Sequence, residues 1–265
     1  MDIQSYVGRT SPVSVKCNGD ARYPCPSCGG KDKLEVSTTG LFYCHKCELK
    51  GKFGTGGAGT RAVESTTAVG EDRLDLYMPA PLDSPHVAYL EGRGYKGQLL
   101  RDLDPYTGPN DNYVYLPVTT MWSTSPQYFI GRAINDQQLR YLNPRGDHFR
   151  SRRSELLWGS HRFRFGPRRL VVCEGIFDAV WGRDRVATFG LQVSTKQMEA
   201  IADMEPEEVV VCFDATARSQ AITMAGRLSK YYTGPIRVAT LPGTTDPDDL
   251  RQDCEQYIDA AERVA

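Results

Sequence analysis

Acidic side chains follow three short apolar segments in the last third of the chain. Glu174 follows RLVVC, Asp214 follows VVVCF, and residues 246–249 follow IRVATL after a short turn. Carboxylates gathered in one place repel one another unless a divalent cation lies among them, so the pattern predicts a shared metal site. Thr216 stands where a second acid would complete an Asp-x-Asp metal motif. This strand end is therefore an altered magnesium site, an inactive copy of one, or an ordinary strand end.

The elements around these acids must bring three strand ends together. From residue 168 onward, short apolar segments alternate with helical ones, and STKQ at 194–197 has the form of a capping box. Strands that alternate with helices predict an α/β fold, a parallel sheet with helices on both faces. Open parallel sheets place their sites beyond the carboxyl ends of the strands, which is where the acids stand.

Two Cys-x-x-Cys pairs near the amino terminus have the spacing of a metal site. They are separated by fifteen residues and consist of Cys25, Cys28, Cys44 and Cys47. Four thiolates suit a tetrahedral Zn²⁺ with no open position, which is a structural site. Because the segment is short, it cannot bury much of a core. The metal must therefore supply much of its folding free energy. His45 is expected outside the ligand set, and Cys17 is expected to be a small apolar residue.

Changes in composition divide the chain into four segments. We expect a zinc ribbon at 1–53, a flexible linker at 54–83, a mixed helix and strand segment at 84–167, and the α/β domain at 168–265. Within the third segment, SPHVAYLEGRGY predicts a helix that Ser84 caps. The alternating YVYLPV and the following YFIGRAI predict two strands.

The charge is unevenly distributed along the chain. The 265 residues carry 32 basic and 33 acidic side chains, a formal net charge of −1. Residues 145–169 contain eight arginines and two acids, whereas residues 170–265 contain 9 basic and 16 acidic side chains. A cationic stretch beside an acidic domain is what a metal-dependent enzyme acting on a polyanion needs, although solvated surfaces are also often uneven in charge.

Several classes of protein are excluded by what the sequence lacks. The first residues have neither the basic nor the apolar region of a secretory signal, and no apolar run reaches the roughly 18 residues of a membrane span. We therefore expect a cytoplasmic protein with no membrane partner, whose cysteines stay reduced. No Walker A motif is present, so the sequence gives no sign of a nucleotide-driven motor.

Several short motifs resemble known families when they are taken in order. EGIFD at 174–178, FD at 213–214 and DPD at 246–248 resemble the three motifs of the Toprim domain. The cysteine ribbon, the linker, a YL-x-x-RG helix at 89–94, a GR…YLNP segment at 131–144 and LLWG at 156–159 resemble bacterial and phage primases of the DnaG type. The resemblance covers nearly the whole chain apart from the linker.

The resemblance implies a DNA-dependent RNA polymerase that makes short RNA primers on single-stranded DNA from ribonucleoside triphosphates. It implies a Toprim parallel sheet joined to an α+β primase subdomain and a zinc ribbon that reads the template. A separate replicative helicase in a bacterial or phage-infected cell would be the partner. Mg²⁺ or Mn²⁺ would be held by Glu174, Asp214, Asp246 and Asp248. Nucleotide or nucleic acid would be bound by Arg132, Arg140, Asn143, Arg152, Arg153 and Lys196.

The sequence departs from this family pattern at three places. Thr216 replaces an acid of the second motif, Arg140 replaces a lysine before Tyr-Leu-Asn, and the sequence ends at Ala265 without a helicase domain. Arg218 is a candidate to offset the lost acid by contacting a phosphate. Two other functions stay open, a catalytically inactive module that binds single-stranded DNA and a Toprim nuclease, although the ribbon and the YLNP segment disfavour the nuclease.

Overall fold

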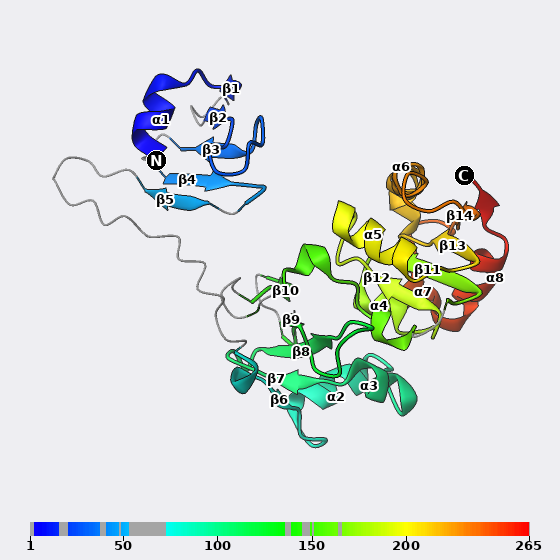
Figure 1. Ribbon diagram of the computed structural model, residues 1–265. Helices are drawn as coiled ribbons and strands as arrows, with labels where there is room; N and C mark the ends of the chain where they lie inside the picture. Colours follow the sequence, from blue (N-terminus) through cyan, green and yellow to red (C-terminus); the bar gives the residue numbers. More distant parts are fainter. Residues whose placement is uncertain are drawn as a thin grey trace. The chain divides into compact units, whose positions relative to one another are not determined.

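The computed structural model divides the chain into two compact units, residues 1–66 and 67–265 (Figure 1). It describes residues 3–15, 21–37, 41–47, 49–52, 73–135, 139–144, 149, 151–163 and 166–264. Cys17, most of the expected linker and part of the arginine-rich stretch lie outside the described residues. In the described part of the chain, no helix has both the length and the apolar composition needed to cross a membrane.

The first unit is an antiparallel sheet preceded by a short helix, α1 (Ile3–Arg9). Its strands lie in sequence order: β1 (Ser14–Val15), β2 (Ala21–Tyr23), β3 (Leu34–Val36), β4 (Leu41–Cys44) and β5 (Lys50–Lys52). The hydroxyl of Tyr6 donates to the carbonyl of Pro24 at 3.0 Å, which ties α1 to the sheet. Among the described residues of this unit, only Leu34 and Val36 join two cysteines in its buried apolar centre, so little hydrophobic burial stabilises the unit.

The second unit begins with another antiparallel sheet. Its spatial order is β10-β9-β8-β7-β6, made of β6 (Met78–Pro79), β7 (Tyr106–Thr107), β8 (Tyr113–Val118), β9 (Tyr128–Ala133) and β10 (Tyr141–Leu142). Helices α2 (Pro85–Gly92) and α3 (Gln98–Leu103) lie between β6 and β7 in the sequence. Oγ of Ser84 accepts a hydrogen bond from the amide of Val87 at 3.3 Å, which confirms the predicted cap.

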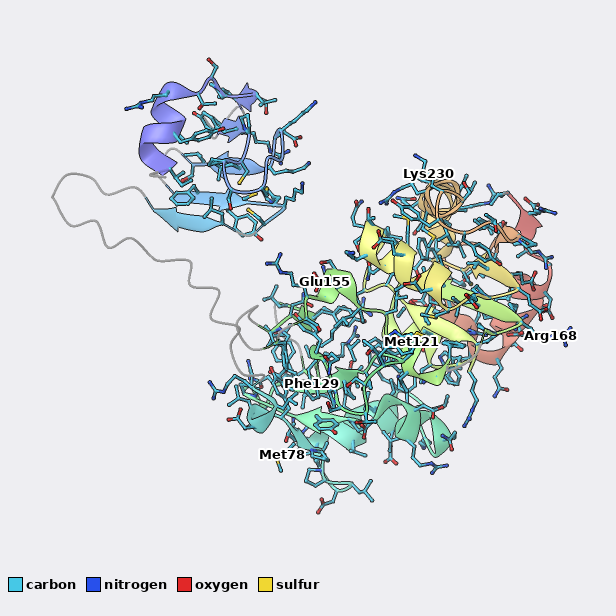
Figure 2. All side chains as sticks on the ribbon, viewed as in Figure 1. Met78, Met121, Phe129, Glu155, Arg168 and Lys230 are labelled. Atoms are coloured by element: carbon cyan, nitrogen blue, oxygen red, sulfur yellow. The ribbon has the colours of Figure 1, made fainter. Side chains whose placement is uncertain are left out.

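The two long strands of this sheet are more deeply buried than their alternating pattern indicates. Every residue of β8 and β9 is buried. Phe129, labelled in Figure 2, stacks on Tyr77 with 4.2 Å between ring centroids. Arg132 points to the other face, where its guanidinium lies 5.5 Å from the ring of Phe177. Both faces of the sheet are therefore covered by other parts of the protein. The alternating residues of β8 and β9 pack on two buried faces, and neither face is exposed to solvent.

The last part of the chain forms the predicted parallel sheet, with order β12-β11-β13-β14-β15. The parallel strands are β11 (Arg169–Cys173), β12 (Arg185–Ala187), β13 (Glu208–Val211) and β14 (Ile236–Val238). An antiparallel edge strand, β15 (Glu262–Arg263), was not predicted. The connecting helices are α4 (Ile176–Ala179), α5 (Thr195–Asp203), α6 (Arg218–Leu228), α7 (Pro247–Leu250) and α8 (Cys254–Asp259). The α/β fold class is confirmed.

Each face of the parallel sheet has its own core. On one face, side chains of α5 and α6 such as Met198 and Met224 pack with Val172 and Val211. On the other face, the core of α4 and α8 continues without a break into the buried aromatic and aliphatic residues of β8 and β9. The predicted segments 84–167 and 168–265 thus share one hydrophobic core, while the exact domain boundaries stay predictions.

Candidate active site and metal centre

The four predicted cysteines come together in the first unit. Their sulfur atoms all lie within 4.8 Å of one another, and Sγ–Sγ distances are 3.6 Å for Cys25 and Cys47 and 3.7 Å for Cys28 and Cys44. Zn–S bonds of about 2.3 Å at tetrahedral corners place sulfurs roughly 3.8 Å apart. The spacing of the thiols therefore fits a structural zinc ion, which the four cysteines would hold.

Neighbouring groups support this ligand set. Burial raises the pKa of the Cys25 thiol to about 12, so metal binding there must displace a proton. Nε2 of His45 lies 3.3 Å from Oε2 of Glu35. The histidine is thus paired with a carboxylate and does not belong to the cysteine cluster, as predicted.

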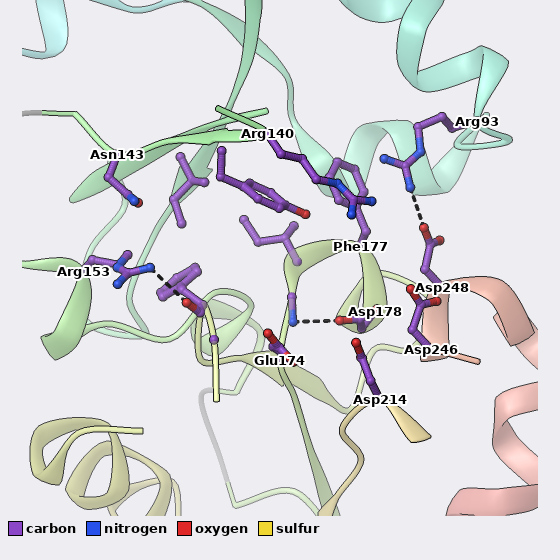
Figure 3. A pocket seen from close by; sticks show the side chains of 16 residues that line it. Arg93, Arg140, Asn143, Arg153, Glu174, Phe177, Asp178, Asp214, Asp246 and Asp248 are labelled. Atoms are coloured by element: carbon purple, nitrogen blue, oxygen red, sulfur yellow. Dashed lines mark hydrogen bonds and ion pairs between the residues drawn. The ribbon is translucent and has the colours of Figure 1, made fainter. Parts of the chain in front are cut away.

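The predicted acids meet in a pocket of about 250 Å³ in the second unit. Figure 3 shows them on one side, with Arg140, Asn143 and Arg153 across the pocket. The charged and amide side chains that line it are Arg93, Arg140, Asn143, Arg153, Glu174, Asp178, Asp214, Asp246 and Asp248. An acidic floor facing cations suits a metal ion together with an anionic ligand such as a polyphosphate.

The ends of the parallel strands position the acids. Glu174 directly follows β11, and Asp214 stands shortly after the neighbouring β13. Asp246 caps α7, because its Oδ1 accepts a hydrogen bond from the amide of Asp249 at 2.6 Å. The reasoning that placed these acids at one edge of a parallel sheet is therefore supported by the geometry.

Asp178 also lines the pocket, although it was not predicted as a site residue. It is 8% exposed, and its Oδ2 accepts a hydrogen bond from the amide of Gly175 at 2.8 Å. A Cβ at position 175 would lie 2.9 Å from that same oxygen, so glycine allows the acid to cap the turn. The signal was present in the sequence, since Asp178 ends the motif that begins with Glu174.

The acids destabilise one another when they are ionised. Burial, and then the charges of Asp214 and Asp246, raise the pKa of Glu174. Burial, and then Asp214, raise the pKa of Asp178 well above its usual value. The pKa of Asp214 is raised by burial and by Asp246, and that of Asp246 by burial and neighbouring aspartates. A bound divalent cation would offset this repulsion, so the donor set fits Mg²⁺ or Mn²⁺.

The acids surround a space rather than forming a tight cage. Across the residues that the structure describes, only the four cysteines form a group of three or more ligands with every ligand atom within 4.8 Å of the others. Mg²⁺ usually keeps several waters and takes one or two carboxylates plus phosphate oxygens. The wide spacing therefore fits an ion that enters with a phosphate-bearing ligand.

Replacing the buried acid Asp178 tests this account of the repulsion. A carboxyl pKa raised by folding means that the native state binds protons more tightly than the unfolded state, so stability falls as the pH rises from about 4 through the folded pKa values. At neutral pH without metal, Asp178→Asn is expected to raise the Tm by roughly 2–4 °C. Its amide oxygen can still accept from Gly175.

The measurement is thermal unfolding between pH 4 and 8 in buffer without Mg²⁺ or Mn²⁺ and without a chelator, because a chelator would also remove the structural zinc. Asp203→Asn, at an exposed position that ends α5, serves as the matched control and should leave the Tm unchanged. An Asp178→Asn protein that is less stable than wild type at pH 7, with unchanged pH dependence, contradicts the account.

Three of the six predicted nucleotide or nucleic-acid residues line the pocket: Arg140, Asn143 and Arg153. Nη1 of Arg153 donates to the carbonyl of Phe189 at 3.0 Å. Phe189 also lines the pocket with a left-handed φ of 65°, a feature that no sequence pattern indicated. These residues form the pocket wall that faces the acids.

The other three residues do not line the pocket. Arg132 is 7% exposed and donates from Nε to the hydroxyl of Tyr89 at 3.0 Å. Arg152 is exposed, and Lys196 on α5 pairs with Glu199 at 3.0 Å. Their contact with nucleotide or nucleic acid stays a prediction.

Thr216 and Arg218, two residues that follow Asp214, do not line the pocket. Thr216 is exposed and does not line the pocket. Arg218 donates to Thr240 at 3.0 Å and pairs with Glu262 at 3.2 Å. Arg218 therefore faces the edge strand β15, and its position does not support the suggestion that it contacts a phosphate in the pocket.

Comparison with known proteins shows which solved structures have a similar fold. No family model matches the chain, and no curated protein matches it. The zinc-binding and RNA polymerase domains of the Aquifex aeolicus primase superpose with a TM-score of 0.61 at 16% identity, covering 99% of this chain and 84% of that one. A DnaG primase catalytic domain bound to single-stranded DNA gives 0.58 at 19%, covering 70% and 76%. The primase fragment of the bacteriophage T7 primase-helicase gives 0.50 at 18%, covering 90% and 97%.

These likenesses define the class of fold. The chain combines a four-cysteine zinc-binding unit with a mixed α/β catalytic-domain fold, in the order found in primases of the DnaG type. The chain has the primase fold, and its pocket lies at the carboxyl ends of its parallel strands.

Proposed function

We propose that this protein is a DNA primase, a metal-dependent nucleotidyltransferase that makes short RNA primers on single-stranded DNA. The observation that carries the proposal is the pocket in which acids from three strand ends face Arg140, Asn143 and Arg153. Catalysis of phosphoryl transfer needs positioning and charge neutralisation more than a dedicated protein base. This pocket offers carboxylates for cations and arginines for phosphates in one place.

The residues divide into two roles. Glu174, Asp214 and Asp246 would hold Mg²⁺ or Mn²⁺. When bound, such an ion lowers the pKa of an attacking hydroxyl and neutralises charge on the triphosphate. Arg140 and Arg153 would bind phosphate oxygens of the incoming ribonucleotide or of the template backbone. Asn143 would orient the ribonucleotide by hydrogen bonds.

The zinc-binding unit would read the template. One of the structural neighbours is a primase domain bound to single-stranded DNA, which supports a single-stranded template for this chain too. Ribonucleoside triphosphates would be the substrates, and a separate replicative helicase in the cytoplasm of a bacterial or phage-infected cell would be the partner. Each of these assignments is part of the proposal.

We expect metal binding to depend on the nucleotide. Thr216 stands where a second motif acid would be, but it is exposed and does not line the pocket, and the acids that do line the pocket form no tight cage. Triphosphate oxygens must therefore complete the ligand set. We expect Mg²⁺ to bind at least about tenfold more tightly when ATP is present. Thr216→Asp and Ser219→Asp, both at exposed positions outside the pocket, should leave this difference unchanged. Equal Mg²⁺ affinity with and without ATP, measured by calorimetric titration, contradicts the prediction.

Primer synthesis tests the function itself. Purified protein, single-stranded DNA of random sequence, labelled ribonucleotides and Mg²⁺ or Mn²⁺ should yield short RNA. DNA binding without any RNA product with either metal would favour an inactive single-strand-binding module. Metal-dependent cleavage of the DNA would favour a nuclease.

A further inference from the structure

One acid of the pocket, Asp248, already accepts hydrogen bonds from three protein donors. Oδ1 of Asp248 accepts hydrogen bonds from the hydroxyl of Tyr95 at 2.5 Å and from Nε1 of Trp181 at 2.9 Å. Oδ2 of Asp248 accepts from Nη2 of Arg93 at 2.8 Å, drawn as a dashed line in Figure 3. The Asp248 side chain is 17% exposed, so these three donors form most of its polar surroundings.

This arrangement leaves Asp248 poorly suited to bind a cation. A carboxylate oxygen has two acceptor positions, and both positions on Oδ1 are taken. A divalent ion on Oδ2 would lie beside the guanidinium of Arg93 and be repelled by it. The carboxylate of Glu174, by contrast, accepts no hydrogen bond from any residue that the structure describes, so its oxygens are available. Only its backbone carbonyl accepts one, from the amide of Gly190 at 3.1 Å.

The contact with Asp248 holds the side chain of Arg93 in one position. Arg93 comes from the end of α2, 155 positions before Asp248 in the sequence, and it lines the pocket. Its guanidinium lies 4.7 Å from the ring of Phe177, and its Nη1 donates to the hydroxyl of Tyr89 at 3.3 Å. Arg93 is thereby fixed as a cation at the rim of the acids, on a different element from Arg140.

Tyr95 and Trp181 fix the position of the Asp248 carboxylate. Burial, followed by the hydrogen bond to Asp248, raises the pKa of the Tyr95 hydroxyl, so it remains a proton donor. The guanidinium of Arg251 lies over the ring of Trp181, 5.4 Å from the ring centroid. Tyr95 is itself fully buried. The carboxylate is therefore oriented by rigid aromatic groups before any ligand arrives.

We propose that Asp248 is a positioning residue that holds Arg93 ready to bind the triphosphate, in place of the metal-ligand role that its motif implies. Arg93 is then the residue that touches the substrate, through charge-assisted hydrogen bonds to phosphate oxygens. This inference rests on the proposed function, because it assigns part of the nucleotide site of the same pocket. It also links the helix α2 to the acids of the parallel sheet.

A charge-balanced double variant tests the proposal. Arg93→Gln with Asp248→Asn removes both members of the pair and leaves the net charge of the pocket unchanged. The whole chain is titrated first with Mn²⁺ alone and then with ATP in the presence of Mn²⁺. We expect Mn²⁺ affinity within about threefold of wild type and ATP affinity reduced about tenfold, the same loss as for Arg93→Gln alone. Asp246→Asn should weaken Mn²⁺ binding by about tenfold or more.

Two results would overturn the proposal. One is a double variant that loses Mn²⁺ affinity as Asp246→Asn does, which would make Asp248 a metal ligand. The other is a double variant whose loss of ATP affinity is the product of the two single losses, which would make the residues independent. If the double variant does not fold, Tyr95→Phe keeps all charges, and it should weaken ATP about threefold while leaving Mn²⁺ binding unchanged.

Failure of the proposed function is a separate result. Wild-type protein that gives the expected binding pattern but makes no primer refutes the primase assignment and leaves the role of Asp248 supported. Wild-type protein that binds neither Mn²⁺ nor ATP refutes both.

Discussion

Glu174→Gln is expected to reduce primer synthesis on the order of 10³-fold, a loss typical of removing one preorganised electrostatic group from an active site. Glutamine keeps the volume of the side chain but removes the charge that a divalent cation needs. The glutamate follows β11 and its pKa is raised by burial and by Asp214 and Asp246, so neutralising it relieves repulsion. The variant should therefore fold, melt no lower than wild type and still fail to make RNA.

The matched control is Glu207→Gln. This residue immediately precedes β13, is 74% exposed and lies outside the pocket, so its loss should change synthesis less than about twofold. Rates are compared on one template at saturating ribonucleotide over a range of Mg²⁺. An active Glu174→Gln protein with an unchanged Mg²⁺ requirement would remove Glu174 from the metal site.

Cys44→Ser is expected to unfold the zinc-binding unit. Cys44 is fully buried and is one of the four clustered thiols, and the surrounding apolar centre is small. Structural zinc contributes on the order of 10 kcal/mol to the folding of such units, which exceeds what this core can replace. The variant should contain no zinc and show random-coil amide shifts for residues 21–52, while residues 73–264 keep their fold.

His45→Ala provides the comparison for that variant. His45 lies next to Cys44 but pairs with Glu35 and is 49% exposed, so its removal should retain one zinc per chain and cost less than about 1 kcal/mol. Zinc content by elemental analysis and amide shifts by NMR decide between the two outcomes. A folded Cys44→Ser unit that still holds zinc would mean that the four thiols are not the ligand set.

Local patterns in the sequence predicted the elements that carry the acids. Apolar runs of four to six residues between helical segments identified β11, β13 and β14, and the strand-end rule then placed Glu174, Asp214 and Asp246 together. The capping box of Ser194 and Gln197 was also predicted. Both of its hydrogen bonds are present, because each backbone amide donates to the side-chain oxygen of the other residue. The cysteine spacing predicted the zinc cluster because four thiols in two tight turns have few other arrangements.

Contacts between distant segments were beyond that reasoning. Arg93 reaches Asp248 only because the core of the antiparallel sheet is continuous with one face of the parallel sheet. The structure buries Arg132 within β9 beside Tyr89, a position that no local pattern indicated, and its predicted contact with nucleotide or nucleic acid stays a prediction. Burial on both faces of β8 and β9 depends on the same packing, which periodicity does not encode.

Anomalous scattering from crystals grown with Mn²⁺ and ATP tests the central claim most directly. The account predicts a manganese peak bounded by Glu174, Asp214 and Asp246, with the triphosphate extending toward Arg140 and Arg93. Manganese and nucleotide bound elsewhere, with the acids of this pocket contacting neither, would contradict it.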